Sequence, residues 1–160
     1  MRNATLCFLL TLCSAVAFGQ QEPQWTVIKH VTLMQQNLDI FLTTLLTPTE
    51  PGFYRISSYL SGGVASDPGN EAVWTATLAG TDIAGAQFKP VPLQIACNQA
   101  SWLSAPPITI SLKPQVPLTY QVIAGGGSRP CQYNLAITVE QLLPPSSSAA
   151  SAGASPEALP

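Results

Sequence analysis

The feature that most constrains the fold of this chain is a two-residue alternation of apolar and polar side chains, which recurs from Trp25 onward. Successive side chains of a β-strand point to opposite faces, so this alternation predicts strands with one buried face. In the clearest case, residues 132–142, the apolar side is formed by Tyr133, Leu135, Ile137 and Val139. The pattern predicts about eight strands, which cover residues 27–33, 38–46, 53–60, 73–78, 93–97, 108–112, 118–124 and 132–142.

Turn-forming residues separate these segments. Pro48 and Pro51 follow the run at 38–46, and proline has no N–H to donate to a strand ladder. Glycine-rich stretches at 61–63 and 125–127 give the backbone the freedom that tight reversals need. Because the strands are short, evenly spaced and without a helical stripe, they predict an all-β, antiparallel sandwich or barrel.

Residues 38–46 are the ambiguous segment. Their apolar positions also fit one face of a short helix, formed by Ile40, Leu42, Leu45 and Leu46. The threonines within the run and the prolines after it favour a strand.

The N-terminal segment predicts export. After a short positive start at 1–3, an almost uninterrupted apolar run extends from Ala4 to Ala17. This run is too short to span a bilayer but fits the core of a signal peptide, and Ala17-Phe18-Gly19 places small residues at the cleavage site. We therefore expect a signal peptide at 1–19 and a secreted, periplasmic or extracellular protein with no membrane span.

Two alternatives at the N-terminus stay open. Ala15-Val16-Ala17 offers a second cleavage site two residues earlier, and Cys13 is a candidate for lipid modification. The residues before Cys13, Leu10-Thr11-Leu12, lack the small side chain that lipoprotein processing requires. Cleavage near Gly19 is therefore the favoured reading.

Cleavage after Gly19 leaves two cysteines, Cys97 and Cys131. An even pair in an oxidising compartment predicts one disulfide. It would close a loop of about 35 residues and stabilise the fold by roughly 3–4 kcal/mol. Two separate buried thiols are the alternative, because sequence does not show how closely the cysteines approach.

The composition changes after the last predicted strand. We expect one β-domain at 24–142, because this region holds all of the alternating segments. Residues 143–160 are rich in Pro, Ser and Ala and lack a bulky apolar set that could offset the entropy of ordering. They are predicted to form a disordered tail.

Charge and titratable residues restrict the function classes. Six basic and eight acidic residues give a net charge of −2, which argues against nucleic-acid binding. His30 is the single histidine, with no His-x-x-x-His or Cys-x-x-Cys spacing, so neither a zinc site nor a cofactor is expected. A triad with His30 and Asp39 lacks a Gly-x-Ser-x-Gly elbow. We expect a surface histidine, no catalytic residues and no enzymatic activity.

One calcium site is conceivable at Asp67, Asn70 and Glu71, whose oxygens suit that ion. The sequence Asp67-Pro68-Gly69 explains the same residues as an Asx turn. We therefore predict no metal site.

Three aromatic residues are the candidates for ligand binding: Trp25, Tyr59 and Trp102. Their rings offer a platform on which a sugar can stack. Trp102 is the best of them, because residues 98–103 read as a loop before Pro106 and Pro107. The favoured alternative places Trp102 over the sheet as part of the core, where tryptophan is often buried.

Four stretches share the pattern of one known group of β-domains. Residues 47–60 contain Gly52-Phe53-Tyr54 before an alternating strand, and residues 74–87 contain an Asp-x-x-Gly hairpin at Asp82. Residues 117–122 and 133–139 match a terminal strand pair. Together they resemble the tumour-necrosis-factor-like jelly-roll superfamily, which includes the heads of complement-type collagen-like proteins and modules of bacteria and phage tail fibres.

The resemblance implies a two-sheet jelly roll, often a trimer, that serves adhesion or recognition and not catalysis. We therefore expect a structural or adhesive domain that self-associates as a trimer or contacts a glycan or a cell-surface protein. The alternative is a monomeric carbohydrate-binding or immunoglobulin-like binding module. An exposed Trp102 flanked by polar groups would favour that alternative.

Overall fold

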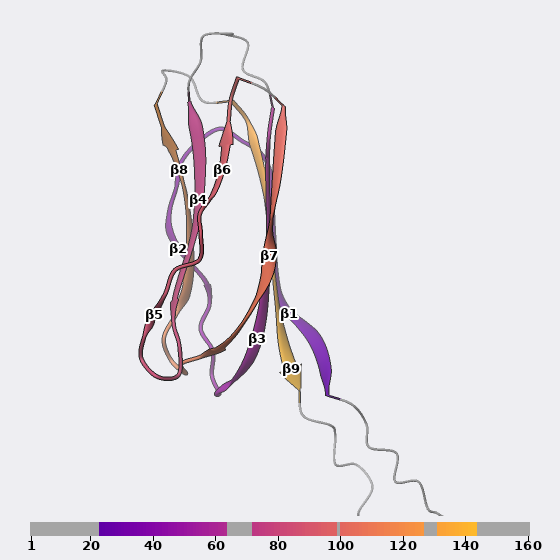
Figure 1. Ribbon diagram of the computed structural model, residues 1–160, viewed down its shortest axis with the longest axis vertical. Coiled ribbons are helices and arrows are strands. Elements are labelled where there is room, and N and C mark those ends of the chain that lie inside the picture. Colours follow the sequence, from indigo (N-terminus) through magenta and orange to yellow (C-terminus); the bar gives the residue numbers. More distant parts are fainter. Residues whose placement is uncertain (1–22, 64–71, 99, 127–130, 144–160) are drawn as a thin grey trace, which may run out of the picture. The chain divides into compact units, whose positions relative to one another are not determined.

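Figure 1 shows the computed structural model of the protein, which describes residues 23–63, 72–98, 100–126 and 131–143. The predicted signal peptide, the tail beyond Leu143 and the calcium candidates Asp67, Asn70 and Glu71 lie outside these residues. The described residues form nine strands: β1 (Gln24–Gln36), β2 (Ile40–Leu46), β3 (Gly52–Gly62), β4 (Val73–Thr81), β5 (Gln87–Phe88), β6 (Leu93–Ala96), β7 (Ser101–Leu112), β8 (Leu118–Gly125) and β9 (Tyr133–Leu143).

The strands form two antiparallel sheets (Figure 1). The first, called the β3 sheet below, has the order β1-β9-β3-β7. The second, called the β4 sheet, has the order β2-β8-β4, and β5 and β6 both pair with β4. Apart from the run β4-β5-β6, consecutive strands switch from one sheet to the other, which is the connectivity of a jelly roll. The all-β jelly-roll sandwich is confirmed, with the two-residue strand β5 added to the eight predicted.

The core lies between the sheets and is formed by alternate residues of their central strands. On β3 the buried side chains include Tyr54, Ile56 and Leu60, and the residues between them face outward. The other central strands contribute Trp74, Ala76, Leu78, Leu118, Tyr120, Val122, Tyr133, Leu135, Ile137 and Val139. The sequence alternation therefore divides each central strand correctly into two sides, and the apolar side expected for residues 132–142 is the buried one.

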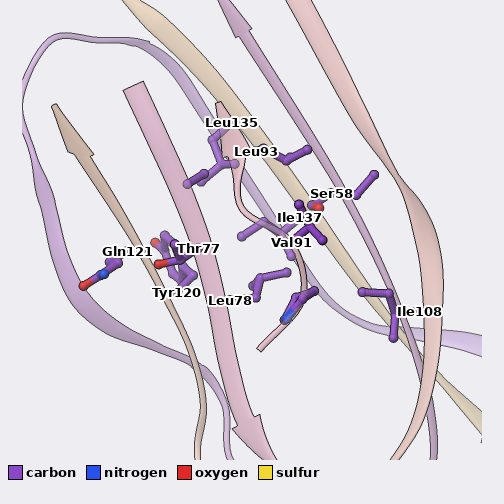
Figure 2. A pocket seen from close by; sticks show the side chains of 13 residues that line it. Ser58, Thr77, Leu78, Val91, Leu93, Ile108, Tyr120, Gln121, Leu135 and Ile137 are labelled. Atoms are coloured by element: carbon purple, nitrogen blue, oxygen red, sulfur yellow. The ribbon is translucent and has the colours of Figure 1, made fainter. Parts of the chain in front are cut away.

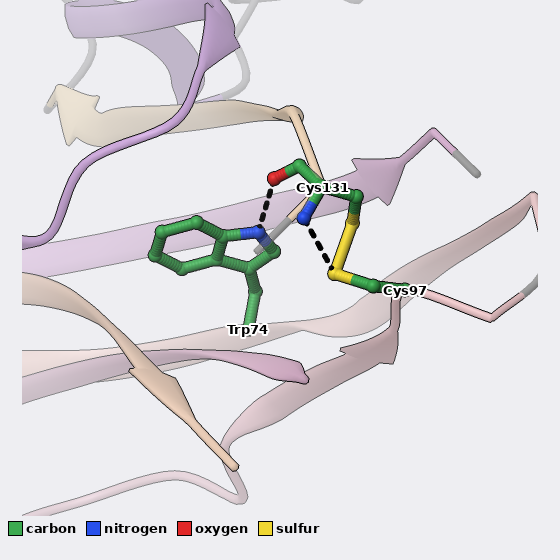
Figure 3. Close-up of a disulfide and its surroundings, with 3 residues drawn as sticks. All are labelled: Trp74, Cys97 and Cys131. Carbon is green, nitrogen blue, oxygen red and sulfur yellow. Dashed lines mark hydrogen bonds between the residues drawn. A yellow bond between two sulfur atoms is a disulfide. The ribbon is translucent and has the colours of Figure 1, made fainter. Parts of the chain in front are cut away.

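Trp74 of β4 is the largest fully buried side chain. Its ring centroid lies 4.4 Å from that of Tyr133 on β9, so it joins the two sheets. Its indole N–H donates a 2.7 Å hydrogen bond to the carbonyl oxygen of Cys131, as Figure 3 shows. Burial raises the pKa of Tyr133 to about 12, with further contributions from Asp39 and Tyr120.

The predicted disulfide between Cys97 and Cys131 is present, so the reading as two separate thiols is wrong. Cys97 follows β6 in the β4 sheet, and Cys131 stands two residues before β9 in the β3 sheet. Their Cα atoms are 5.3 Å apart, and both side chains are buried beside Trp74 (Figure 3). The bond therefore links the two sheets next to Trp74, the largest fully buried side chain.

Strand β7 differs most from the prediction. It begins at Ser101, so the expected loop around Trp102 is extended strand that pairs with β3. Pro106 and Pro107 fall within a register shift, where β3 advances from Ile56 to Ser58 while β7 moves from Ile108 to Ala105. Proline is tolerated in edge strands and bulges, and β7 is an edge strand.

The ambiguous segment at 38–46 forms strand β2, as favoured over a helix. It lies at the edge of the β4 sheet and pairs with β8, with two register shifts. The predicted hairpin at Asp82 is also present. Asp82 Oδ1 accepts a 2.7 Å bond from the Ala86 N–H, and Gly85 adopts a positive φ of 88°.

Candidate binding face

The three aromatic candidates lie on one surface, the outer face of the β3 sheet. Directly paired residues of antiparallel strands share a face, and Trp102 pairs with Ser61 while Trp25 pairs with Leu142. Tyr59 lies two residues from Ser61 on β3 and therefore points the same way. The structure thus places all three rings on the face opposite to the core.

Trp102 and Tyr59 are neighbours on this face. Tyr59 pairs with Ser104, two residues from Trp102, so the two rings occupy diagonal positions within reach of each other. Trp102 is 71% exposed and Tyr59 39% exposed. The favoured reading of Trp102 as part of the core is therefore wrong, because Trp74 fills that role and Trp102 points outward from an edge strand.

The surroundings of this aromatic pair are polar and uncharged. Ser61 and Ser104 stand opposite the two rings, and Asn134 lies on the neighbouring strand β9. The Asn134 side chain donates a 3.2 Å hydrogen bond to Ser61 Oγ and accepts a 2.8 Å bond from the Gln35 backbone N–H. These contacts fix an amide and a hydroxyl beside the exposed rings.

Trp25 lies toward the opposite end of the face and does not join Tyr59 and Trp102. The guanidinium of Arg55 stands 4.8 Å from the centroid of the Trp25 ring, a cation–π contact that covers one side of the indole. Arg55 also binds Glu140 through two hydrogen bonds of 2.6 and 2.7 Å. These bonds hold the pKa of Glu140 below its ordinary value and raise the pKa of Arg55, so each charge neutralises the other.

Phe53 is an outward aromatic residue that the sequence-based candidates omit. It is 55% exposed, pairs with Ser111 and lies two residues from Arg55 on β3. The alternation in residues 53–60 already places Phe53 on the same side as Tyr59. This shared side is the sequence signal that could have identified Phe53. The sequence does not show, however, that this side of β3 is exposed; the position of the core between the sheets does.

The titratable residues considered for catalysis, His30 and Asp39, lie apart, and each makes its own hydrogen bonds. The exposed His30 is hydrogen-bonded with Thr138 at 2.9 Å and Thr32 at 2.7 Å. Asp39 accepts a 2.8 Å bond from the Ala124 backbone N–H in the β4 sheet, so the structure does not bring it to His30. In the part of the chain that the structure describes, no three His, Cys, Asp or Glu residues are grouped to hold a metal ion.

The described residues also line hollows away from this face. A cavity of about 20 Å³ between the sheets is lined mainly by aliphatic residues such as Leu93, Leu135 and Ile137 (Figure 2), and has room for roughly one water molecule. An open groove of about 640 Å³ lies outside the β4 sheet, where Leu42 and Val91 are among its walls. Neither hollow contains one of the predicted binding residues.

No helix in residues 23–63, 72–98, 100–126 or 131–143 is long and apolar enough to cross a membrane.

Comparisons with known proteins give similarity to solved structures only. The sequence matches no protein-family model and no curated protein sequence. The structure is similar to infectious bursal disease virus VP2 in a subviral particle, at 10% identity and a TM-score of 0.40 over 77% of this chain. This chain spans about a third of that protein, 34% of its length.

Two further structures are similar. A pentameric capsid protein from metagenomic phage sequences has 15% identity and a TM-score of 0.43, over 90% of this chain and 87% of that one. The CBM22-1–GH10 modules of xylanase 10B from Clostridium thermocellum, complexed with xylohexaose, have 10% identity and a TM-score of 0.33, over 75% of this chain and 24% of that one.

The protein is a jelly-roll β-sandwich, a class that follows from the strand order of its two sheets. This is the fold that the family resemblance implied. The finer assignment to the tumour-necrosis-factor-like superfamily stays a prediction.

Proposed function

We propose that this protein is an exported, non-enzymatic recognition domain that binds a glycan on the outer face of its β3 sheet. The observation that carries the proposal is the position of Trp102, which is 71% exposed on a paired strand beside Tyr59. A large indole costs less to bury than to leave in water, so an exposed one held in place by a rigid sheet favours a contact role.

A glycan suits this surface chemically. The face of an aromatic ring is apolar and carries partial negative charge, so it attracts the C–H groups of a sugar ring. The hydroxyl and amide groups of Ser61, Ser104 and Asn134 supply hydrogen-bond partners for the sugar hydroxyls. Ligand sites commonly combine an aromatic surface with a few polar groups that fix orientation.

The separate contacts of the titratable side chains also favour a binding role over catalysis. His30 is held between two threonine hydroxyls, Glu140 is paired with Arg55, and Asp39 accepts a backbone N–H. General acid–base catalysis needs such groups to converge on a reacting atom, and these residues serve three separate contacts.

Export is supported by the disulfide together with the apolar run before Gly19. Disulfides form and persist in oxidising compartments, such as the periplasm and the extracellular space. The Cys97–Cys131 bond is consistent with such a location for this chain.

Replacing Trp102 with alanine is expected to weaken glycan binding at least about tenfold, since aromatic anchors carry most of the binding energy at such surfaces. The measurement is affinity electrophoresis of the protein in gels that contain cellulose derivatives, xylan, mannan or soluble chitin. Val91→Ala is the control, because Val91 is 87% exposed between β5 and β6, two strands that pair with β4 in the other sheet.

Both variants should keep the free energy of unfolding within about 0.5 kcal/mol of the wild type, since both side chains are exposed. Unchanged retardation of Trp102→Ala, or an equal loss in Val91→Ala, would contradict the proposed site.

A second candidate function is self-association, with the trimer that the family resemblance implies. It is favoured by β2, an edge strand without a charged residue on which Phe41 is 75% exposed. Uncharged, apolar edge strands are prone to pair with other chains.

For self-association through β2 we expect light scattering to give a trimer mass for the wild type and a monomer mass for Phe41→Ser. A monomeric wild type would exclude it.

A further inference from the structure

We infer that the ligand of this face is an extended, uncharged polysaccharide chain that lies along β3, with its ends on Trp102 and Tyr59 at one side and on Phe53 at the other. The inference rests on the proposed glycan-binding function and assigns Phe53 to the site. It also distinguishes recognition of the interior of a long chain from recognition of a single terminal sugar.

The spacing of the aromatic residues indicates an extended ligand. Phe53 and Tyr59 are six residues apart on β3 and point to the same face. A strand rises about 3.3 Å per residue, so their Cα atoms are separated by roughly 20 Å. Phe53 is 55% exposed and Tyr59 39% exposed, so each end of the face offers an open ring. One sugar cannot reach both rings, whereas a chain along the strand can.

The surface between the two ends carries hydrogen-bonding groups. Ser57 lies between Arg55 and Tyr59 on the outward side of β3 and pairs with Thr138 on β9. Thr138 in turn is hydrogen-bonded with His30 of β1. This row of hydroxyl and imidazole groups gives the middle of a sugar chain polar partners, and between it and Phe53 the chain would pass over Arg55, whose guanidinium lies against the Trp25 ring.

The charges of the face favour an uncharged chain. Strands β3 and β9 hold one charged residue each, Arg55 and Glu140, and β7 holds none. Arg55 and Glu140 bind each other through two hydrogen bonds, so their opposite charges neutralise each other on this face. The whole chain has a net charge of −2, which opposes the approach of a polyanion.

The test compares short and long oligosaccharides on the full chain by isothermal titration calorimetry. The probes are the disaccharides and hexasaccharides of cellulose, xylan and chitin, with oligogalacturonates as the acidic comparison. We expect at least one neutral hexasaccharide to bind at least tenfold more tightly than its disaccharide. Phe53→Ala should remove this advantage and leave disaccharide binding unchanged, whereas Trp102→Ala should weaken both.

Phe53→Leu serves as a second variant, because it removes the ring but keeps an apolar side chain of similar size. Val91→Ala is again the control, because Val91 is exposed and lies between β5 and β6, which pair with β4. Equal affinity for the two lengths, a loss of disaccharide binding in Phe53→Ala or Phe53→Leu, or a preference for oligogalacturonates would overturn the extended neutral chain while leaving glycan binding intact. Failure of every glycan to bind, or wild-type binding by Trp102→Ala, would overturn the proposed function as well.

Discussion

Replacing Trp74 with alanine is expected to lower the free energy of unfolding by about 4–5 kcal/mol, the largest effect of any single substitution considered for this protein. The side chain is fully buried, and its ring packs at 4.4 Å from that of Tyr133 across the two sheets. Alanine would leave a cavity between the sheets. It would also leave the Cys131 carbonyl oxygen without the indole N–H that lies 2.7 Å from it.

Equilibrium urea denaturation, followed by fluorescence and circular dichroism, measures this change. Trp74→Phe helps to separate the two contributions, because it removes the hydrogen-bond donor but keeps an aromatic ring and so leaves a smaller cavity than alanine does. Trp102→Ala is the matched control, since it deletes the same side chain from an exposed position. Similar unfolding midpoints for Trp74→Ala and Trp102→Ala would show that the packing described for Trp74 is wrong.

Removing the disulfide should lower the free energy of unfolding by about 3–4 kcal/mol, because the unfolded chain regains the freedom of the closed loop. The two cysteines are 34 residues apart in the sequence, and their bond joins the end of β6 to the segment that enters β9. The double variant Cys97→Ala and Cys131→Ala tests this without leaving a lone thiol in the core.

The same denaturation experiment on the wild type with and without dithiothreitol provides the comparison. Reduction should destabilise the wild type by an amount close to that of the double substitution and should leave the double variant unaffected. A double variant as stable as the oxidised wild type would contradict a stabilising role for the bond.

Much of the fold could be predicted from local sequence patterns. Residues 53–60, 73–78, 118–124 and 132–142 were predicted as strands, and each lies within or almost within an observed strand. The division of each strand into two sides was also predicted, because alternation within one strand is set by the backbone itself. For residues 38–46, the threonines and the prolines that follow were enough to favour a strand over a helix, and the structure shows strand β2 there.

Strand β7 shows where local patterns fail. The sequence indicates a loop at residues 98–103 before its two prolines and a strand only at 108–112, yet residues Ser101–Leu112 pair with β3 along almost their full length. The pairing is possible because β7 lies at an edge and a register shift absorbs the prolines. Both conditions depend on which strand lies next to β7.

The candidate site was predictable in part. Trp25, Tyr59 and Trp102 were selected by residue type, and the structure places them on one face but groups only Tyr59 with Trp102. Phe53 was missed because sequence alternation separates two sides of a strand without saying which is buried.

The sequence by itself determined most of the strand content and the two sides of each regular strand, since alternation and turn residues act locally, and it made a Cys97–Cys131 bond the favoured pairing. Only the tertiary structure decided that Trp74 fills the core while Trp102 is exposed, and that Phe53 shares a face with Trp102. The physical reason is that exposure depends on strand order and on which sheet covers which, and these are set by contacts between residues far apart in the chain.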